Sequence, residues 1–221
     1  MNLTFFGADR AVTGSCHCID INGKRILVDC GLQQGRDEID NSVFPFSAAE
    51  IDAVIVTHAH IDHSGRLPLL YKKGFRGPIY TTKFTAELLS IMLQDSAHIQ
   101  ESEVQWQNQK NKRADRELKE PLYSIEDAAR TMDLIKTYDY NNKFEVAEGV
   151  ECLFVDAGHI LGSSMVELWL TENGITKKIV FSGDIGNKNK PIMNDPTYIK
   201  QADYVVTEST YGDRIHEGEG D

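Results

Sequence analysis

The chain has 221 residues, of which 41% are hydrophobic and 26% are charged, and its formal net charge is −11. This composition is typical of a globular domain with a sizeable core, and no apolar run approaches the roughly 20 residues that a bilayer-spanning helix needs. The acidic balance disfavours non-specific binding to nucleic acid, because phosphates attract lysine and arginine.

The first part of the chain is rich in predicted strands. Short apolar runs predict strands over residues 3–7 and 15–21, and Asn22-Gly23 is a strong signal for a hairpin turn into a returning strand over residues 24–31. After a short helix, expected near residues 46–51, the almost continuous apolar run 52–57 predicts a strand that is buried on both faces. Histidines begin at the carboxyl end of this strand.

Helical patterns dominate the middle of the chain. We expect a helix over residues 66–73 with Ser64 as its N-cap, then a short strand over residues 79–81. A helical insertion is predicted around residues 83–136, broken at Pro121, and the mixed charges of its middle favour a solvated helix or a mobile connector.

Strands return in the last third of the chain. They are predicted over residues 144–146, 150–156, 164–170, 177–182 and 204–206. Strands at both ends with helices between them predict a layered α/β domain.

The strongest chemical signal is the segment Thr57-His58-Ala59-His60-Ile61-Asp62-His63-Ser64-Gly65, which directly follows an apolar strand. A loop can turn several of these side chains toward one point, whereas a strand would send His58 and His60 to one face and His63 to the other. Imidazole and carboxylate are suitable ligands for zinc and related divalent ions. The cluster therefore predicts a metal site, with a polar surface loop as the alternative.

Two later segments repeat this design of an apolar strand followed by a glycine-flanked polar residue. They contain His159, between Gly158 and Gly162, and Asp184, between Gly183 and Gly186. Alone, His159 would be a packing residue and Asp184 a turn former, but beside the first cluster both are predicted as metal ligands. Because one carboxylate can bridge two cations, Asp184 is the candidate for a shared ligand.

Taken in order, the polar segments resemble the signature of the metallo-β-lactamase superfamily, and the resemblance covers nearly the whole chain. The matching residues are Asp29, His58, His60, Asp62, His63, His159 and Asp184. A finer resemblance is to the β-CASP branch of nucleic-acid-processing enzymes, in particular to prokaryotic ribonucleases similar to the mRNA 3′-end cleavage endonuclease. It is carried by residues 95–101, 121–123, 158–163 and 208–212.

The resemblance implies a metallo-β-lactamase αββα sandwich and two zinc sites. His58, His60 and His159 would hold one ion, Asp62 and His63 would contribute to the second, and Asp184 would lie between them. The implied catalytic residues also include Asp29, orienting a water or a ligand histidine, and Glu208, orienting a histidine that protonates the leaving oxygen. The implied activity is zinc-dependent hydrolysis of phosphodiester bonds in RNA, with single-stranded RNA as the substrate. We also expect no membrane partner and a cytoplasmic location.

The same resemblance predicts that the sandwich is incomplete. The family uses two further histidines downstream of its acidic motif, and His216 lies too close to Glu208 to replace either. We therefore expect residues 1–207 to form the N-terminal part of the metallo-β-lactamase domain and residues 208–221 to begin a truncated β-CASP region. Such a fragment would hold one or two zinc ions, would have weak or no nuclease activity and could self-associate through exposed strand edges.

Two alternative functions stay open. One is a small-molecule metallohydrolase of the same fold that acts on thioesters or lactones. The other is a non-catalytic subunit of an RNA-processing complex. The segment 208–212 argues against the first alternative, and the intact set of N-terminal ligands argues against the second.

Other chemically suggestive residues have simpler interpretations. Alternation along a strand places His17 opposite Cys16 and Cys18, which predicts packing rather than a metal trio. His98 is expected on a helix surface, with a role near the site as the less favoured alternative. Of the two tryptophans, Trp169 favours a core or an interface, while Trp106 stays undecided. The four cysteines, without a secretion signal, predict reduced thiols.

Overall fold

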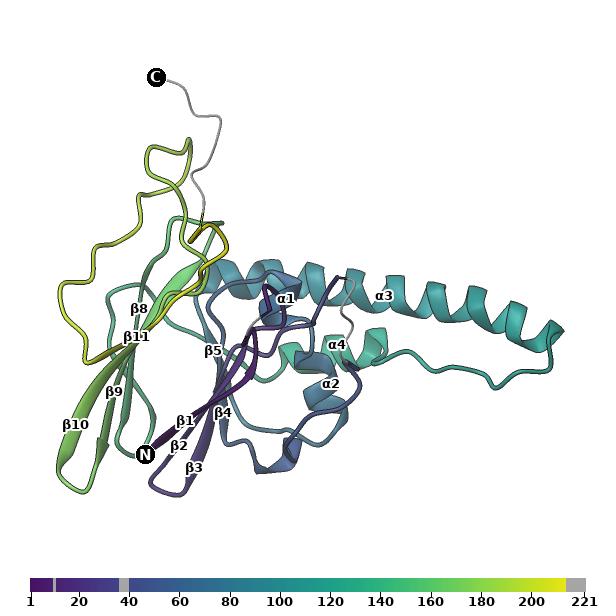
Figure 1. Cartoon of the computed structure of the whole chain (residues 1–221), viewed down its shortest axis with the longest axis horizontal. Helices are drawn as coiled ribbons and strands as arrows, with labels where there is room; N and C mark the ends of the chain where they lie inside the picture. The colour runs from purple at the N-terminus through teal and green to yellow at the C-terminus, as the bar shows by residue number, and fades with distance from the viewer. Residues whose placement is uncertain (10, 36–39, 214–221) are drawn as a thin grey trace.

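The computed structural model describes residues 1–9, 11–35 and 40–213. Two β-sheets lie against each other, and the helices cover the outer face of the first sheet, so that the molecule consists of three layers (Figure 1). The predicted mixed α/β sandwich is therefore confirmed. Within the described part of the chain, no helix covers the outer face of the second sheet.

The first sheet is built from the first half of the chain and contains both antiparallel and parallel pairs. Its six strands follow one another in chain order. They are β1 (Asn2–Gly7), β2 (Cys16–Ile21), β3 (Lys24–Val28), β4 (Ala53–Ile55), β5 (Ile79–Thr81) and β6 (Ile135–Thr137). β1, β2 and β3 pair antiparallel, and β3, β4, β5 and β6 pair parallel.

The second sheet is an antiparallel meander that ends in one parallel strand. Its five strands lie in the order β11-β10-β9-β8-β7. Their bounds are β7 (Phe144–Ala147), β8 (Val150–Asp156), β9 (Ser164–Glu172), β10 (Ile175–Phe181) and β11 (Tyr204–Val206). β11 pairs parallel to β10, with Phe181 opposite Val206. This pairing brings residues 207–213 next to the segment that follows β10.

Four α-helices and one 3-10 turn complete the described structure. They are η1 (Ala48–Glu50), α1 (Ile61–Ser64), α2 (Leu67–Lys72), α3 (Lys83–Arg113) and α4 (Ile125–Met132). The prediction that Ser64 caps the second of these helices is wrong. Ser64 ends α1, where its hydroxyl donates to the carbonyl groups of Ala59 and His60, and the N-cap of α2 is Arg66.

The helical insertion predicted around residues 83–136 is only partly helical. α3 ends at Arg113, a connector over residues 114–124 leads to α4, and Ile135–Thr137 forms the edge strand β6. The sequence did not reveal β6 because three residues are too few to show a period of two. Asn108 fastens the connector to α3 by exchanging two hydrogen bonds with the backbone of Lys119.

Two apolar layers hold the structure together. One lies between the first sheet and the helices, and it includes Cys16, Cys18, Leu89 and Leu93. The other lies between the two sheets. The cysteines of β2 thus face the helices while His17 faces the opposite way, which confirms the predicted alternation. All four cysteines are buried and free.

α3 is fixed at its N-terminal end and projects at its C-terminal end (Figure 1). Its N-cap Thr82 accepts a hydrogen bond from the backbone of Thr85. Trp106 lies on the projecting half, 58% exposed, with the Lys110 ammonium 3.3 Å from its ring centroid. Trp169 is half-buried on β9, between the side chains of Lys143 and Lys178. In the described ranges, no helix is both long and apolar enough to cross a membrane.

Candidate metal centre

Each of the three polar segments of the site follows the end of a strand. β4 leads into residues 56–60, β8 into residues 157–163 and β10 into residues 182–186. The first two segments are joined across the sheets, because the Ser164 backbone N–H and hydroxyl both donate to the carbonyl of Thr57, at 2.9 and 3.0 Å. This junction brings the loop that carries His159 beside the loop that carries His58 and His60.

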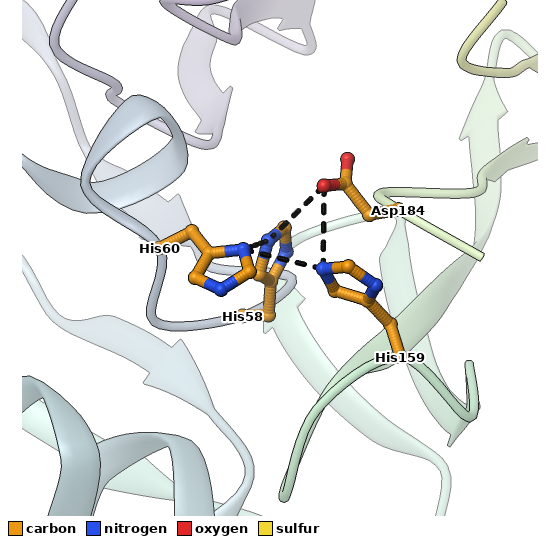
Figure 2. A group of neighbouring side chains, drawn as sticks. All are labelled: His58, His60, His159 and Asp184. Atoms are coloured by element: carbon orange, nitrogen blue, oxygen red, sulfur yellow. Dashed lines mark hydrogen bonds and ion pairs between the residues drawn. The ribbon is translucent and has the colours of Figure 1, made fainter. Parts of the chain in front are cut away.

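Four side chains converge on one point from both sheets (Figure 2). The ligand atoms of His58, His60, His159 and Asp184 all lie within 4.8 Å of one another. His60 Nδ1 lies 3.1 Å from His58 Nε2 and 3.2 Å from His159 Nε2. Asp184 Oδ2 lies 3.6 Å from His58 Nε2 and 3.4 Å from His159 Nε2.

These separations fit a tetrahedral zinc site. With bonds of about 2.0–2.1 Å from zinc to nitrogen, the ligand atoms of a tetrahedron lie about 3.3–3.4 Å apart. Four of the six separations scatter around that value, between 3.1 and 3.6 Å, and all six lie within 4.8 Å. His58, His60, His159 and Asp184 could therefore hold a zinc ion once the remaining pairs of ligand atoms draw closer together.

A second group of ligand atoms lies on the other side of Asp184. His63 Nε2 is 3.1 Å from Asp184 Oδ1 and 3.9 Å from Asp62 Oδ2. One oxygen of Asp184 thus faces the first group while the other faces His63. A carboxylate shared by two cations needs this arrangement, with one oxygen directed to each cation. It suits paired metal ions, which lie about 3.5–4 Å apart.

Asp29 connects the two groups of ligands through hydrogen bonds. Its Oδ2 accepts a 2.7 Å hydrogen bond from His63 Nδ1, and its Oδ1 accepts a 2.9 Å bond from the backbone of Thr57. The Thr57 hydroxyl lies 3.0 Å from both Asp29 Oδ2 and His58 Nδ1. Asp29 therefore orients His63 directly and His58 through Thr57, which leaves Nε2 of each ring free for a metal ion.

The backbone at Asp29 adopts a conformation that few side chains favour. Its φ is +61°, in the left-handed region, and the residue is only 1% exposed. Strained backbone of this kind persists where the surrounding structure enforces it, and it is concentrated at functional sites. Here the enforcing contacts include a bond from Asp29 N to Ile55 O and one from Cys30 N to His63 O, each 2.8 Å long.

The ionisation of the histidines follows from burial and from the carboxylates. Burial, and then the neighbouring His63 ring, lower the pKa of His58 well below its usual value, so this ring is neutral. Burial also lowers the pKa of His159. For His63, burial is outweighed by the charge of Asp29 and by hydrogen bonds to Asp184 and Asp29, which raise its pKa to about 10. Without a cation, His63 is therefore an imidazolium held between two carboxylates.

Two contacts hold the Asp184 loop in place. The backbone of Gly186 lies so close to the His159 loop that an added Cβ would be 1.7 Å from the carbonyl oxygen of Gly158. Glu208 Oε1 accepts a 2.8 Å hydrogen bond from the backbone of Ile185. Among the described residues, no histidine bonds to Glu208, and this carboxylate instead anchors the loop that carries Asp184.

The cluster lies at the bottom of an open cleft of about 1140 Å³. Its lining includes residues of β1 and of the segment after it, with Phe5 and Val12 exposed, and residues from 185–190 and 207–213. Of the described residues, Lys190 is the sole lysine or arginine that lines the cleft. The lining is thus predominantly acidic, because Asp9, Glu208 and Asp213 add to the carboxylates of the ligand cluster.

The structure gathers most of the predicted site residues in this cleft. Asp62, His63, His159, Asp184, Asp29 and Glu208 line it, and His58 and His60 contact His159 at its base. His98 is exposed on α3 and does not line the cleft. His216 lies outside the described residues.

Sequence reasoning missed Ser15, His17, Thr57 and Lys190 as parts of the cleft. A signal was present for the first two, because residues two apart on a strand share a face. Ser15 and His17 therefore had to face away from Cys16 and Cys18, toward the space between the sheets.

Comparisons with known proteins agree with this geometry. The model of the metallo-β-lactamase superfamily domain matches residues 18–210. The chain is 37% identical to Ribonuclease TTHA0252 of Thermus thermophilus over 98% of this chain and 45% of that protein. It is 33% identical to Transcription termination factor FttA of Methanosarcina mazei over 96% of this chain and 32% of that protein. The chain thus spans less than half the length of these relatives.

A third relative is Cleavage and polyadenylation specificity factor 73 of Drosophila melanogaster, 31% identical over 96% of this chain and 29% of that protein. Among solved structures, a metallo-β-lactamase of Cronobacter sakazakii aligns with a TM-score of 0.53 at 14% identity, covering 87% of this chain and 60% of that one. The enzyme BJP-1 of Bradyrhizobium japonicum aligns with a TM-score of 0.51 at 18% identity, covering 89% of this chain and 65% of that one. These structures share the fold.

Proposed function

The chain belongs to the metallo-β-lactamase superfamily, and from this membership we propose that it is a zinc-dependent hydrolase of phosphodiester bonds in single-stranded RNA. The observation that carries the proposal is the two-part ligand cluster around Asp184 at the base of an open cleft. The ribonuclease names of its relatives support the choice of RNA over the thioesters and lactones of small-molecule hydrolases.

Each residue of the cluster has a role in the proposed reaction. His58, His60 and His159 would hold one zinc ion, Asp62 and His63 the other, with Asp184 between them. When bound, two divalent cations supply Lewis-acid chemistry that activates water and stabilises charge on the reacting phosphate. Asp29 orients His63, while Glu208 fixes the Asp184 loop and is our candidate to orient the proton donor for the leaving oxygen.

The acidic charge of the protein is compatible with this substrate because the cations and Lys190 act where the phosphate binds. Bound cations would offset the carboxylates of Asp62 and Asp184. Lys190 would contact a phosphate next to the one that is cleaved, and the exposed Phe5, which also lines the cleft, offers a ring on which a base can stack.

The proposal is tested by metal content and cleavage together. We expect the purified chain to bind zinc, and the His58→Ala variant to bind it much more weakly because it loses a ligand of the first group. Cleavage of a 5′-labelled single-stranded RNA, of bis(p-nitrophenyl) phosphate and of a lactone is compared between the wild type and this variant. RNA cleavage that requires zinc and His58 is the expected result.

The matched control is His98→Ala, because His98 is an exposed histidine outside the cleft. This variant should retain full zinc content and activity. A wild-type chain that binds no zinc would contradict the proposal. Lactone hydrolysis without RNA cleavage would assign the site to a small-molecule hydrolase, and zinc binding without cleavage of any of the three substrates would indicate a non-catalytic subunit.

A further inference from the structure

His17 is a buried histidine of the cleft that belongs to neither group of ligands. It lies on β2 with its side chain between the two sheets, and it is 8% exposed. Its Nδ1 is buried and has no hydrogen-bond partner among the described residues. A buried ring nitrogen without a partner costs free energy, so the position calls for an explanation other than simple packing.

A chain of hydrogen bonds connects His17 to the metal centre. His17 Nε2 lies 3.4 Å from the hydroxyl of Ser15, which donates to Asp29 Oδ2 at 3.1 Å. The same carboxylate oxygen accepts the 2.7 Å bond from His63 Nδ1. His17 is therefore three hydrogen bonds away from a ring that faces Asp184.

The direction of these bonds follows from the number of hydrogens available. The hydroxyl of Ser15 has one hydrogen, which it gives to the carboxylate, so its lone pair faces His17. His17 must then carry its hydrogen on Nε2 and leave Nδ1 bare, which agrees with the partnerless Nδ1. Burial lowers the pKa of His17, so the ring is neutral and has this single hydrogen to donate.

The His17 ring also contacts the second sheet. It stacks on Phe181, with centroids 5.7 Å apart and planes 22° apart, and Phe5 meets it edge-on at 5.2 Å. Phe181 is the last residue of β10, which leads into the loop of Asp184. His17 is thus linked to two residues that position the ligands. It is connected to Asp29 by way of Ser15, and it packs on Phe181, which precedes the Asp184 loop.

We propose that His17 is a positioning residue which, through Ser15, holds Asp29 in the orientation that aligns His63 with the second group of ligands. The inference rests on the proposed function, since the alignment matters because His63 would bind a cation. Ser15 donates to Oδ2 of the Asp29 carboxylate, and Thr57 donates to Oδ1 through its backbone and to Oδ2 through its hydroxyl. Loss of the bond from Ser15 would leave Thr57 as the sole other donor besides His63 in this network, so the carboxylate could rotate and carry the His63 ring with it.

Three variants separate hydrogen bonding from packing. His17→Phe keeps a ring against Phe181 but removes the donor, His17→Gln places an amide donor at the position of Nε2, and Ser15→Ala breaks the chain without touching His17. A purely structural role predicts that the phenylalanine variant resembles the wild type. A role in positioning predicts that His17→Phe and Ser15→Ala behave alike and that His17→Gln is close to the wild type.

The first measurement needs no metal. In the chelator-treated protein, proton NMR follows the hydrogen of His63 Nδ1, which the bond to Asp29 should protect from exchange with water. We expect His17→Phe and Ser15→Ala to accelerate this exchange at least tenfold, while the thermal midpoint of unfolding stays within a few degrees. His17→Gln should retain the protection.

The second measurement is the affinity for a second cobalt ion, followed by the visible absorption of Co²⁺. Loss of a residue that orients a ligand lowers metal affinity by about 10–100-fold, and we expect this loss for His17→Phe and Ser15→Ala. Because both act through one chain, the double variant should be no weaker than either single variant. Unchanged exchange and affinity in both variants, or equal losses in His17→Gln and His17→Phe, would overturn the inference. A wild type that binds no cation contradicts the proposed function instead, and the exchange measurement still decides the role of His17.

Discussion

At the scale of single residues, the site depends on one buried carboxylate. Asp29 has a left-handed backbone and a side chain whose two oxygens accept bonds from Ser15, Thr57 and His63. These bonds determine which nitrogen of His63, and through Thr57 of His58, remains for a metal ion. The chemistry of the site therefore depends on a residue that would not itself contact a cation.

Lys190 provides a test of the substrate at the same scale. Since it is the sole lysine or arginine among the described residues of the cleft, Lys190→Ala should raise the KM for RNA several-fold. The affinity for RNA falls as salt rises, and losing one phosphate contact should make the plot of log affinity against log salt less steep by about 0.7. Steady-state cleavage at several salt concentrations measures both changes.

The control for this prediction is Lys188→Ala. Lys188 lies on the same loop, is exposed and does not line the cleft. Its replacement should leave the KM and the salt dependence unchanged, and Lys190→Ala should leave the hydrolysis of bis(p-nitrophenyl) phosphate unchanged because this small diester has no neighbouring phosphate. Equal effects of the two lysine variants would show that the cleft does not use Lys190.

At the scale of elements, the ligands are placed by loops that follow strands and are tied to one another. Ser164 joins the end of the His159 loop to Thr57, and Thr82 and Thr85 at the start of α3 both donate to the carbonyl of Gly162. Gly186 donates to Ala157, 2.9 Å away. The positions of the loops therefore depend on bonds between the loops and on bonds to the start of α3.

Gly186→Ala tests the contact between the His159 and Asp184 loops. The new Cβ would lie 1.7 Å from the carbonyl oxygen of Gly158, so the two backbones must move apart and separate Asp184 from His159. We expect the variant to fold and to bind zinc at least tenfold more weakly, as measured by competition with a chromogenic chelator.

Gly174→Ala is the matched control. Gly174 has a φ of +76° in a hairpin turn, and nothing lies within 4 Å of its added Cβ. This substitution should cost about 1–2 kcal/mol of stability through backbone strain, with no change in zinc affinity. If both variants lowered zinc affinity equally, the effect would come from general destabilisation rather than from the contact between the loops.

At the scale of the whole molecule, the candidate centre joins the two sheets. His58 and His60 follow β4 of the first sheet, whereas His159 and Asp184 follow β8 and β10 of the second. A cation bound by all four would cross-link the sheets at one end of the core between them. Metal binding should therefore stabilise the entire fold and not only the loops.

Thermal unfolding measures this effect. At a free zinc concentration 100 times the dissociation constant, binding contributes about 2.7 kcal/mol, which raises the melting temperature by roughly 5–10 °C for a chain of this size. Excess chelator should abolish the gain. Asp184→Asn should weaken it, and an equal zinc effect in that variant would place the binding elsewhere.

The gain from zinc should also diminish as the pH falls. The pKa of His63 is raised from 6.5 to about 10 by the carboxylates around it, so without zinc the imidazolium stabilises the fold fully below pH 6.5 and loses this effect progressively as the pH rises to about 10. Zinc needs the same nitrogen deprotonated, so protons compete with it. Melting temperatures measured with and without zinc between pH 6 and pH 9 should diverge as the pH rises, whereas a constant difference would contradict competition at His63.

Prediction from the sequence succeeded where a pattern extends over several residues. The strands before the polar segments were predictable because apolar runs and hairpin turns are local signals, as at Asn22-Gly23. The error at Ser64 had a local cause as well, since a short helix already uses its hydroxyl. β6 was missed because its pairing with β5 lies in the tertiary structure and not in its three residues.

The sequence by itself determined the layered α/β class, the nature of the candidate ligands and their places after strands, because residue chemistry and periodicity are written along the chain. Only the tertiary structure decided that His58, His60, His159 and Asp184 meet within 4.8 Å, since they come from two sheets whose contact no local pattern encodes. The tertiary structure alone also revealed the bonds from His17 through Ser15 to Asp29. Their geometry depends on a left-handed turn at Asp29 and on the register of β2 against β3, which are properties of the packed sheets.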